Sequence, residues 1–589
     1  MLDNDNLSFI HLSEPRTNVC VTFPDGVVFE APKGTSVEHF LQKHREINPD
    51  AYPSEIMGGI VDSRLRELSY PIQRDASISP VTLSDSDGRR IYRRTLVLLL
   101  VTAANELFPG VEVSVSYAVP DGGYYCMVKN HAPFTEEEFQ ALNERMHAIV
   151  AADDPITKQV MKLSEAIEMY EARGDANKVR LMRQRTRGDL NIYTLRGHAD
   201  YYYGYMLPST RYLKLFRLIN TPAGGFILQY PRSSTPNMLT DEVDNGGKIS
   251  RLFEHAEQLA ERLGVEDIGR LNQIVTSNRV QELILVAEAI HEQQISAIAQ
   301  AVYDAYHERE LRLVLIAGPS SSGKTTFSKR LAIHLLAHGL RPFTVELDNY
   351  FLDRELTPKD ETGNYDFEAL EAINLPLFNR QLKELIEGAQ VALPRFNFKL
   401  GKSVEGVSIK LDSNHILVIE GIHGINPRLV TDIPDSRIYR IYVSALTQLN
   451  IDNQNRIPTT DVRLLRRICR DAYSRGHNAN ATINMWPSVR RGEKRNIFPY
   501  QENADVIFNS ALNYELASLK PIAEPLLLQV PVGTPAYIEA NRLLSFIRWV
   551  SPFSPEQQLM IPDTSLLREF IGGSILGDYL PGGLHTKDV

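Results

Sequence analysis

A run of small residues in the middle of the chain has the composition and spacing of a phosphate-binding loop. Residues 318–325 read GPSSSGKT and fit the pattern G-x-x-x-x-G-K-[ST] at every fixed position. Glycines let backbone N–H groups curl around a phosphate, and the start of the following helix adds partial positive charge. Lys324 can reach the outer phosphates and the Thr325 hydroxyl can hold Mg²⁺. The residues predicted to bind the phosphates are Gly318, Pro319, Ser320, Ser321, Ser322, Gly323, Lys324, Thr325 and Thr326.

Two carboxylates follow apolar runs that we predict to be strands of the same sheet. Asp348 follows residues 343–347, and Glu420 follows residues 416–419. The carboxyl ends of parallel strands meet at one edge of a sheet, where ligands bind. One carboxylate there could simply cap the next helix. Two of them beside a phosphate loop are better explained by Mg²⁺ and by a hydroxyl that must lose its proton.

Apolar runs alternate with helical stretches over residues 311–530, a pattern that predicts an α/β fold with a doubly wound parallel sheet. The predicted strands are 312–317, 343–347, 416–419, 438–443 and 506–508.

An arginine-rich helix is predicted to begin near Thr460. Its apolar residues recur on one face, and Arg463, Arg467 and Arg470 share another. Such a face is usually only solvated, but acidic partners at helical spacing are sparse here, so anion binding is an equal alternative. The basic run at 490–495 could form a lid that closes on the nucleotide.

Five motifs occur in the order found in the uridine kinase branch of the phosphoribulokinase/uridine kinase family, which this region resembles. They are GPSSSGKTT (318–326), LDNYF (347–351), GNYDF (363–367), EGI (420–422) and DVRLLRRICRD (461–471), the last followed by Arg475 and Gly476. The resemblance implies an ATP- and Mg²⁺-dependent kinase acting on the 5′-hydroxyl of uridine or a related pyrimidine nucleoside.

The same resemblance implies a role for each matching residue. Asp348 would be the general base for the 5′-hydroxyl, with Lys324, Arg470 and Arg475 acting on the transferring phosphates. Mg²⁺ would be bound by Thr325, Glu420 and Asp348. The nucleoside would be held by Tyr365, Asp366, Phe396 and Arg467. This chain has Phe396 and Gly401 where the family has a tyrosine and a histidine, so stacking on the base is kept while polar readout of its edge is lost or supplied elsewhere.

The front half resembles two other modules, both from threonyl-tRNA synthetases. Residues 17–86 are similar to the TGS domain, and 87–235 to the second additional domain, which edits mischarged tRNA. The family's four editing positions read Arg94, Leu98, Tyr202 and Met206 here. These side chains provide neither a metal-ligand set nor a proton-transfer group, so we expect no editing.

Two features of the front half are compatible with an RNA contact. The tyrosines at 201–203 could stack bases, although packing against neighbouring strands is the more common explanation. A helical hairpin at 165–187 carries the basic cluster Arg180, Arg183, Arg185 and Arg187, which is otherwise read as a solvated face.

The rest of the sequence sets the context for these sites. Residues 236–310 are predicted to be a helical connector and 531–589 a helical tail. The net charge is −10, three scattered cysteines indicate no disulfide framework, and no apolar run is long enough to span a bilayer. We expect a cytoplasmic homo-oligomer. The alternative to a nucleoside kinase is an RNA-binding regulator whose kinase domain is a nucleotide-gated switch or inactive.

Overall fold

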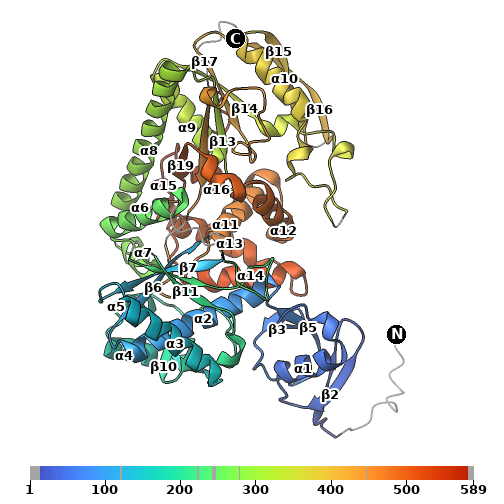
Figure 1. The fold of residues 1–589 in the computed structure, drawn as a ribbon, viewed down its shortest axis with the longest axis vertical. Coiled ribbons are helices and arrows are strands. Elements are labelled where there is room, and N and C mark those ends of the chain that lie inside the picture. Colours follow the sequence, from blue (N-terminus) through green and yellow to red (C-terminus); the bar gives the residue numbers. More distant parts are fainter. Residues whose placement is uncertain are drawn as a thin grey trace, which may run out of the picture.

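The structure is a computed structural model that describes residues 14–581 except for 120–121, 222–223, 242–246, 278, 362, 399 and 447–448. The molecule is elongated, with the P-loop domain (311–530) at one end and the N-terminal domain (17–86) projecting from the other (Figure 1). Among the described helices, none combines the length and apolar character that a bilayer crossing demands.

The N-terminal domain is a five-stranded sheet in the order β2-β1-β5-β3-β4, packed against helix α1 (Val37–Ile47). Its strands are β1 (Asn18–Thr22), β2 (Val28–Pro32), β3 (Ile56–Val61), β4 (Arg64–Arg66) and β5 (Ala76–Thr82). The turn between β1 and β2 contains Gly26, whose φ of 86° favours glycine. Helix α1 is capped by Ser36, whose hydroxyl accepts the backbone N–H of His39.

The second module (87–235) is built around the apolar helix α2 (Ser86–Leu107). It contains two antiparallel sheets, ordered β11-β12-β7-β6 and β10-β9-β8. The elements are β6 (Glu112–Val119), β7 (Gly123–Lys129), α3 (Glu136–Ala151), β8 (Ile156–Lys162), α4 (Leu163–Arg173), α5 (Ala176–Met182), β9 (Asp189–Leu195), β10 (His198–Tyr201), β11 (Arg217–Asn220) and β12 (Phe226–Gln229). Helices α4 and α5 confirm the predicted hairpin, which turns at Gly174.

The connector is helical, as predicted, and leads directly into the P-loop domain. Its helices are α6 (Lys248–Leu263), α7 (Ile268–Val275) and α8 (Val280–Arg309). Helix α8 runs along one side of the P-loop domain, next to its first helix, α9 (Lys324–Ala337) (Figure 1).

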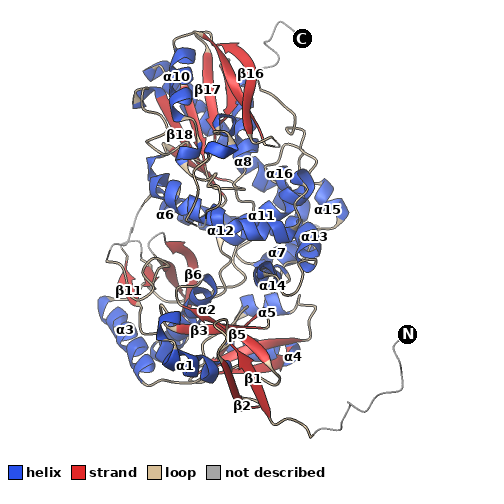
Figure 2. Cartoon of the chain, turned by 90° about the vertical axis from the view of Figure 1, so that its right-hand side faces the viewer, coloured by secondary structure: helices blue, strands red, loops and turns tan. Residues whose placement is uncertain are grey.

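The P-loop domain confirms the predicted doubly wound sheet, with five parallel strands in the order β14-β17-β13-β18-β19. These strands are β13 (Leu313–Ala317), β14 (Arg341–Glu346), β17 (His415–Glu420), β18 (Ile438–Ser444) and β19 (Val506–Asn509). Successive residues of β13 enter different cores: Leu313 and Leu315 face one, Val314 and Ile316 the other. The sheet is therefore covered on both faces (Figure 2).

The remaining elements of this domain surround the site. They are α10 (Leu375–Ile386), the hairpin β15 (Gln390–Asn397) and β16 (Lys402–Lys410), α11 (Thr459–Arg470), α12 (Ala479–Asn496) and α13 (Glu515–Leu528). Three local predictions need correction. Strand β14 ends two residues before Asp348, which lies on the 3₁₀ turn Leu347–Tyr350. Helix α11 follows Pro458 rather than a Thr460 cap. Residues 490–495 belong to the helix α12 and do not form a separate lid segment.

The C-terminal tail is not an appendage, because it completes a core shared by several parts of the chain. Its helices are α14 (Pro535–Ile547), α15 (Pro555–Leu559) and α16 (Arg568–Ile571). Tail residues such as Phe546 pack in one cluster with Tyr170 of the second module, Leu271 of the connector and Leu464 of α11. The front half and the P-loop domain are thus joined by buried apolar contacts.

Candidate active site

The phosphate loop connects β13 to α9, and its glycines are needed for close packing. A Cβ on Gly318 would lie 2.0 Å from the backbone oxygen of Val443, and Gly323 has a φ of 86°. The Lys324 ammonium donates to the backbone oxygen of Pro319 at 3.3 Å. That hydrogen bond keeps the lysine folded over the loop, where it can exchange one backbone oxygen for phosphate oxygens.

The two predicted carboxylates lie at the same edge of the sheet as this loop. Glu420 ends β17, next to β13, and its Oε1 accepts a hydrogen bond of 2.8 Å from the Thr325 hydroxyl. Burial raises the pKa of Glu420. A threonine hydroxyl joined to a carboxylate at a phosphate loop fits the oxygen ligands that Mg²⁺ prefers.

Asp348 faces the same edge and is held less tightly. None of the described residues makes a hydrogen bond to its carboxylate. The residue is exposed at the surface, yet the protein packed around its carboxylate, together with the negative charge of Glu420, raises its pKa to about 6. Lys324 and Arg475 oppose this shift, so Glu420, Lys324 and Arg475 all act electrostatically on Asp348.

Three arginines converge on one buried carboxylate beside the loop. Asp471 is fully buried, and Arg467, Arg470 and Arg475 approach it at 3.3, 3.4 and 3.4 Å. The chain there forms a short π-helix, Asp471–Arg475, a local irregularity often found at functional sites. Even with Glu569, which lies 3.7 Å from Arg470, two carboxylates do not neutralise three guanidinium groups, so this cluster is electrostatically suited to an anion.

Two further arginines of α11 are structural, which corrects the prediction of a uniform arginine face. Arg463 and Arg466 are buried and form ion pairs with Glu493 and Glu515. Arg463 also donates to the backbone oxygen of Ser320 at 2.9 Å. Acidic partners at helical spacing are indeed sparse on α11, and these two arginines find their partners on α12 and α13 instead.

The sequence did not identify two carboxylates associated with helix α12: Glu493 lies on the helix and contacts the loop, and Glu368 packs against the helix. The Glu493 carboxylate accepts the backbone N–H of Ser320 at 3.2 Å. Burial would raise the pKa of Glu493, but Arg463 and Arg490 outweigh burial and lower it. Glu368 lies against Gly492, where a Cβ would be 2.2 Å away, and burial together with the charge of Glu493 raises the pKa of Glu368 to about 7.

The tail also reaches the loop. Glu569 of α16 accepts hydrogen bonds from the hydroxyl and the backbone N–H of Thr326, at 3.0 and 3.4 Å. Its other oxygen lies 3.7 Å from Arg470. A tail carboxylate therefore occupies donors at the start of α9 and contacts one of the predicted phosphate-binding arginines.

The predicted nucleoside-binding residues do not form one contact network. Arg467 donates to the Ser320 hydroxyl at 2.8 Å, whereas Asp366 lies 3.9 Å from Arg495. Phe396 is buried among other rings and only 5% exposed. The exposed rings near this side of the site are Tyr365, Phe367 and Phe398.

The four editing positions of the front half do lie together, but as a packed site. Arg94 donates to the backbone oxygen of Tyr205 at 2.7 Å. Leu98, Tyr202 and Met206 are all buried. Three of the four side chains therefore belong to the hydrophobic core, and Arg94 lies at its edge.

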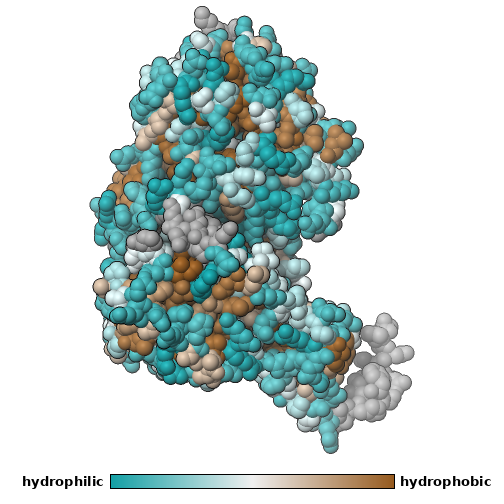
Figure 3. All heavy atoms as spheres, viewed as in Figure 1, coloured by the Kyte–Doolittle hydropathy of each residue, from teal (hydrophilic) through white to brown (hydrophobic). Residues whose placement is uncertain are grey.

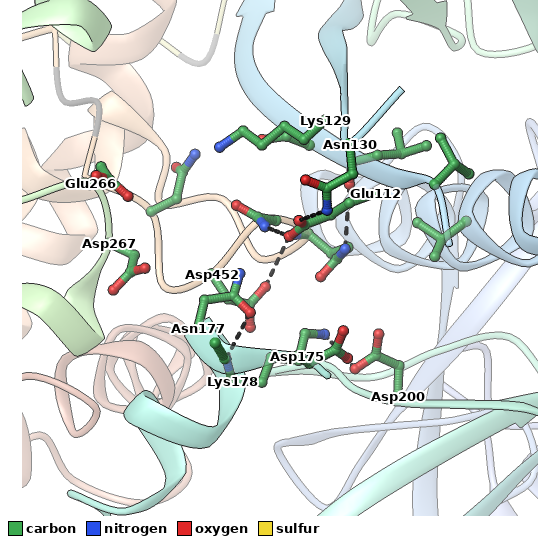
Figure 4. A pocket seen from close by; sticks show the side chains of 18 of the residues that line it. Glu112, Lys129, Asn130, Asp175, Asn177, Lys178, Asp200, Glu266, Asp267 and Asp452 are labelled. Carbon is green, nitrogen blue, oxygen red and sulfur yellow. Dashed lines mark hydrogen bonds and ion pairs between the residues drawn. The ribbon is translucent and has the colours of Figure 1, made fainter. Parts of the chain in front are cut away.

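A cavity of about 560 Å³ separates the second module from the connector and a P-loop-domain segment (Figure 4). Carboxylates dominate its lining, among them Glu112, Asp175, Asp267 and Asp452. The buried Lys178 is already paired with Asp200. An excess of negative charge makes this cavity unsuited to nucleotide phosphates.

Almost nothing in the sequence indicated which carboxylates contact the phosphate loop and its arginines. Thr326 and Glu569 are 243 positions apart, and Arg463 and Glu493 are 30 apart. The contacts of Asp471 with Arg467 and Arg475, both at i,i+4 spacing, are the ones that a helical pattern could indicate.

The fold and this site are those of the P-loop kinase class. Comparison with known proteins then indicates the family within that class. The model of the phosphoribulokinase/uridine kinase family matches residues 313–517, so this part of the chain is a kinase domain of that family. Solved structures with similarity include one described as a candidate fructose transport system kinase from Silicibacter (22% identity, 36% of this chain and 98% of that chain, TM-score 0.26). Another is described as a candidate uridine kinase from Bacillus stearothermophilus (18% identity, 34% and 89%, TM-score 0.23).

The N-terminal half is similar to threonine–tRNA ligases. The ligase of Burkholderia lata is 31% identical over 209 residues, which cover 35% of this chain and 32% of the relative. The ligase of Parabacteroides distasonis is 29% identical over 206 residues, covering 35% and 31%. The chain thus matches about a third of the length of these relatives.

Proposed function

We propose that the protein is an ATP- and Mg²⁺-dependent kinase that phosphorylates the 5′-hydroxyl of uridine or a related pyrimidine nucleoside. One observation carries the proposal: the Asp348 carboxylate lacks a hydrogen-bond partner among the described residues and lies within electrostatic reach of Lys324, Glu420 and Arg475. An unpaired carboxylate beside a phosphate loop is suited to accept the proton of an incoming hydroxyl.

The proposed reaction is an in-line transfer. The 5′ oxygen of the nucleoside bonds to the γ-phosphorus of ATP while the bond to the β–γ bridging oxygen breaks. The 5′ proton passes to Asp348, and ADP leaves. Mg²⁺ at Thr325 and Glu420 would supply positive charge to the phosphates. Lys324 and the arginines around Asp471 orient and neutralise the transferring group.

The nucleoside specificity rests on the family motifs and on the aromatic side of the site. Tyr365 and Phe398 present exposed rings on which a base can stack. Polar groups that meet the ribose hydroxyls would be left unpaired by a deoxy sugar, at a cost of about 1–3 kcal/mol. Deoxyuridine is therefore expected to lose about tenfold in kcat/KM.

Release of ADP across a panel of nucleosides and free sugars tests the proposal. We expect uridine or cytidine to give the highest kcat/KM and purine nucleosides and hexoses to give at least about a hundredfold less. A panel in which a free sugar is the best substrate, or in which no acceptor exceeds the ATPase background, would refute it.

A further inference from the structure

The C-terminal tail places a carboxylate on groups that we predict to bind phosphate. Glu569 lies on α16, which packs beside α11 in both ribbon views (Figures 1 and 2). Its Oε2 accepts the hydroxyl and the backbone N–H of Thr326, and its Oε1 lies 3.7 Å from Arg470. All three side chains are largely buried, so a phosphate reaches Thr326 only by displacing the carboxylate.

The start of α9 explains why an anion lies there. The N-cap residue is Gly323, which has no side chain to accept the free N–H groups of the first turn. Thr326 is the third residue of the helix, so its N–H is one of these free donors. A carboxylate and a phosphate satisfy such a donor equally well in kind. Glu569 and a nucleotide are therefore alternatives at this position.

A second contact holds the chain that follows α16 against the same helix. Lys329 lies three residues after Thr326, and its ammonium donates to the backbone oxygens of Leu576 and Gly577, both at 2.7 Å. Residues three apart share one face of a helix. The tail therefore follows this face of α9 from the carboxylate of Glu569 to the backbone held by the lysine.

The tail is fixed at one end and has a natural hinge in the middle. Helix α16 is anchored, because Leu567 and Phe570 are fully buried. Two glycines follow it, and Gly572 and Gly573 have φ values of 87° and 77°, which glycine adopts readily. Release of the tail is therefore expected in the side chain of Glu569 and in the chain beyond the glycines, while α16 stays in place.

These contacts lie outside the part of the chain that defines the kinase family. The family model matches residues 313–517, whereas Glu569 and the chain held by Lys329 belong to the tail. The N-terminal domain projects from the other end of the molecule, as the space-filling view shows (Figure 3). The contacts of Glu569 and Lys329 thus join the tail to the kinase domain and do not involve that projecting domain.

We propose that the contacts of Glu569 and Lys329 form an autoinhibitory latch. In the nucleotide-free protein Glu569 occupies donors meant for a phosphate group, and a nucleoside di- or triphosphate displaces it and loosens the tail. Such coupling is reciprocal, so a nucleotide that opens the latch binds more tightly once the latch has been weakened. The proposal requires nucleotide binding alone and does not depend on which acceptor the kinase uses.

Lys329→Met tests the latch without changing any residue that we predict to contact a phosphate. Methionine keeps the long apolar stem and removes the ammonium. The matched control is Lys520→Met, because this lysine of α13 also donates to a tail backbone oxygen, that of Val550 at 2.6 Å, outside the latch. Isothermal titration of the full-length proteins with ADP and Mg²⁺ gives the Kd of each single variant, of Glu569→Gln and of the double variant. Calorimetric unfolding shows that each protein is folded.

We expect Lys329→Met and Glu569→Gln each to bind ADP about two- to tenfold more tightly, as for a latch closed in about half to nine-tenths of the molecules. Lys520→Met should stay within about twofold of the wild type. Because both latch substitutions release the same contact, the double variant should gain less than about twofold over the tighter single variant. In the wild type, ADP with Mg²⁺ should speed hydrogen exchange of the amides at 572–577 at least about threefold.

Three results would overturn the latch. They are unchanged or weaker ADP binding by Lys329→Met, gains that multiply in the double variant, and exchange at 572–577 that stays the same or slows when ADP is added. The first and third would identify Glu569 as a permanent cap of α9. None of these results bears on the acceptor, which the panel of nucleosides and sugars tests separately.

Discussion

At the scale of single residues, the site is an arrangement of carboxylates whose environments differ. Asp348 has no hydrogen-bond partner among the described residues, Glu420 accepts a hydrogen bond from Thr325, and Glu493 forms ion pairs with arginines. The phosphate loop and the positions of Asp348 and Glu420 could be predicted from the sequence because each follows a short motif or a strand. Glu368, Glu493 and Glu569 could not, since their contacts depend on distant segments and follow no periodicity.

The raised pKa of Asp348 predicts a pH dependence. A general base must be ionised, so a pKa of about 6 in the free enzyme means that kcat/KM falls as the pH drops below about 6. The profile is measured between pH 5 and 8 with the nucleoside below its KM. A profile that stays flat down to pH 5 would show that the base has an ordinary carboxylate pKa.

At the scale of elements, helices α11, α12 and α16 brace the phosphate loop. The strands that carry the loop were predictable from apolar runs, and the hairpin of α4 and α5 from its glycine. The role of the arginine helix was not predictable, because the partner of Arg463 is Glu493, 30 positions away on α12, whereas Arg467 meets Asp471 one helical turn along the chain.

Glu493→Gln is expected to destabilise the protein. It removes the charge that compensates the buried Arg463, and breaking one partner of a buried pair costs about 3–5 kcal/mol. Urea unfolding measures the change. Glu361→Gln, at an exposed surface pair, is the control and should alter stability by less than about 0.5 kcal/mol. Equal stability of both variants would show that Glu493 does not help to hold the phosphate loop in place.

Glu569→Gln is expected to strengthen ATP binding. The substitution keeps the size of the side chain but removes a negative charge from the start of α9 and from Arg470. Isothermal titration should show a Kd for ATP about two- to tenfold lower, equivalent to about 0.5–1.5 kcal/mol. Glu556→Gln serves as the control in the tail. Weaker binding by Glu569→Gln would mean that the carboxylate supports the nucleotide site.

At the scale of the whole molecule, the front half and the kinase domain form one structure. The sequence indicated separate modules because each has its own motifs. It could not show that Tyr170, Leu271, Leu464 and Phe546 share a core, since burial between domains leaves no local pattern.

Removal of residues 1–310 is therefore expected to expose apolar surface on the remaining fragment. Differential scanning calorimetry should show a single main transition for the full chain and a lower Tm for the fragment, which should also aggregate more readily. A fragment that is as stable and soluble as the intact chain would show that the shared core contributes little to the kinase domain.

The central claim is that Asp348 removes the proton from the acceptor hydroxyl, and Asp348→Asn tests it most directly. The amide keeps the shape but cannot accept the proton, and general-base catalysis contributes about 10²–10⁴-fold. We predict a kcat at least about a hundredfold lower, with ATP binding through Lys324 largely retained. A folded Asp348→Asn protein with near-normal kcat and unchanged ATP affinity would contradict the account.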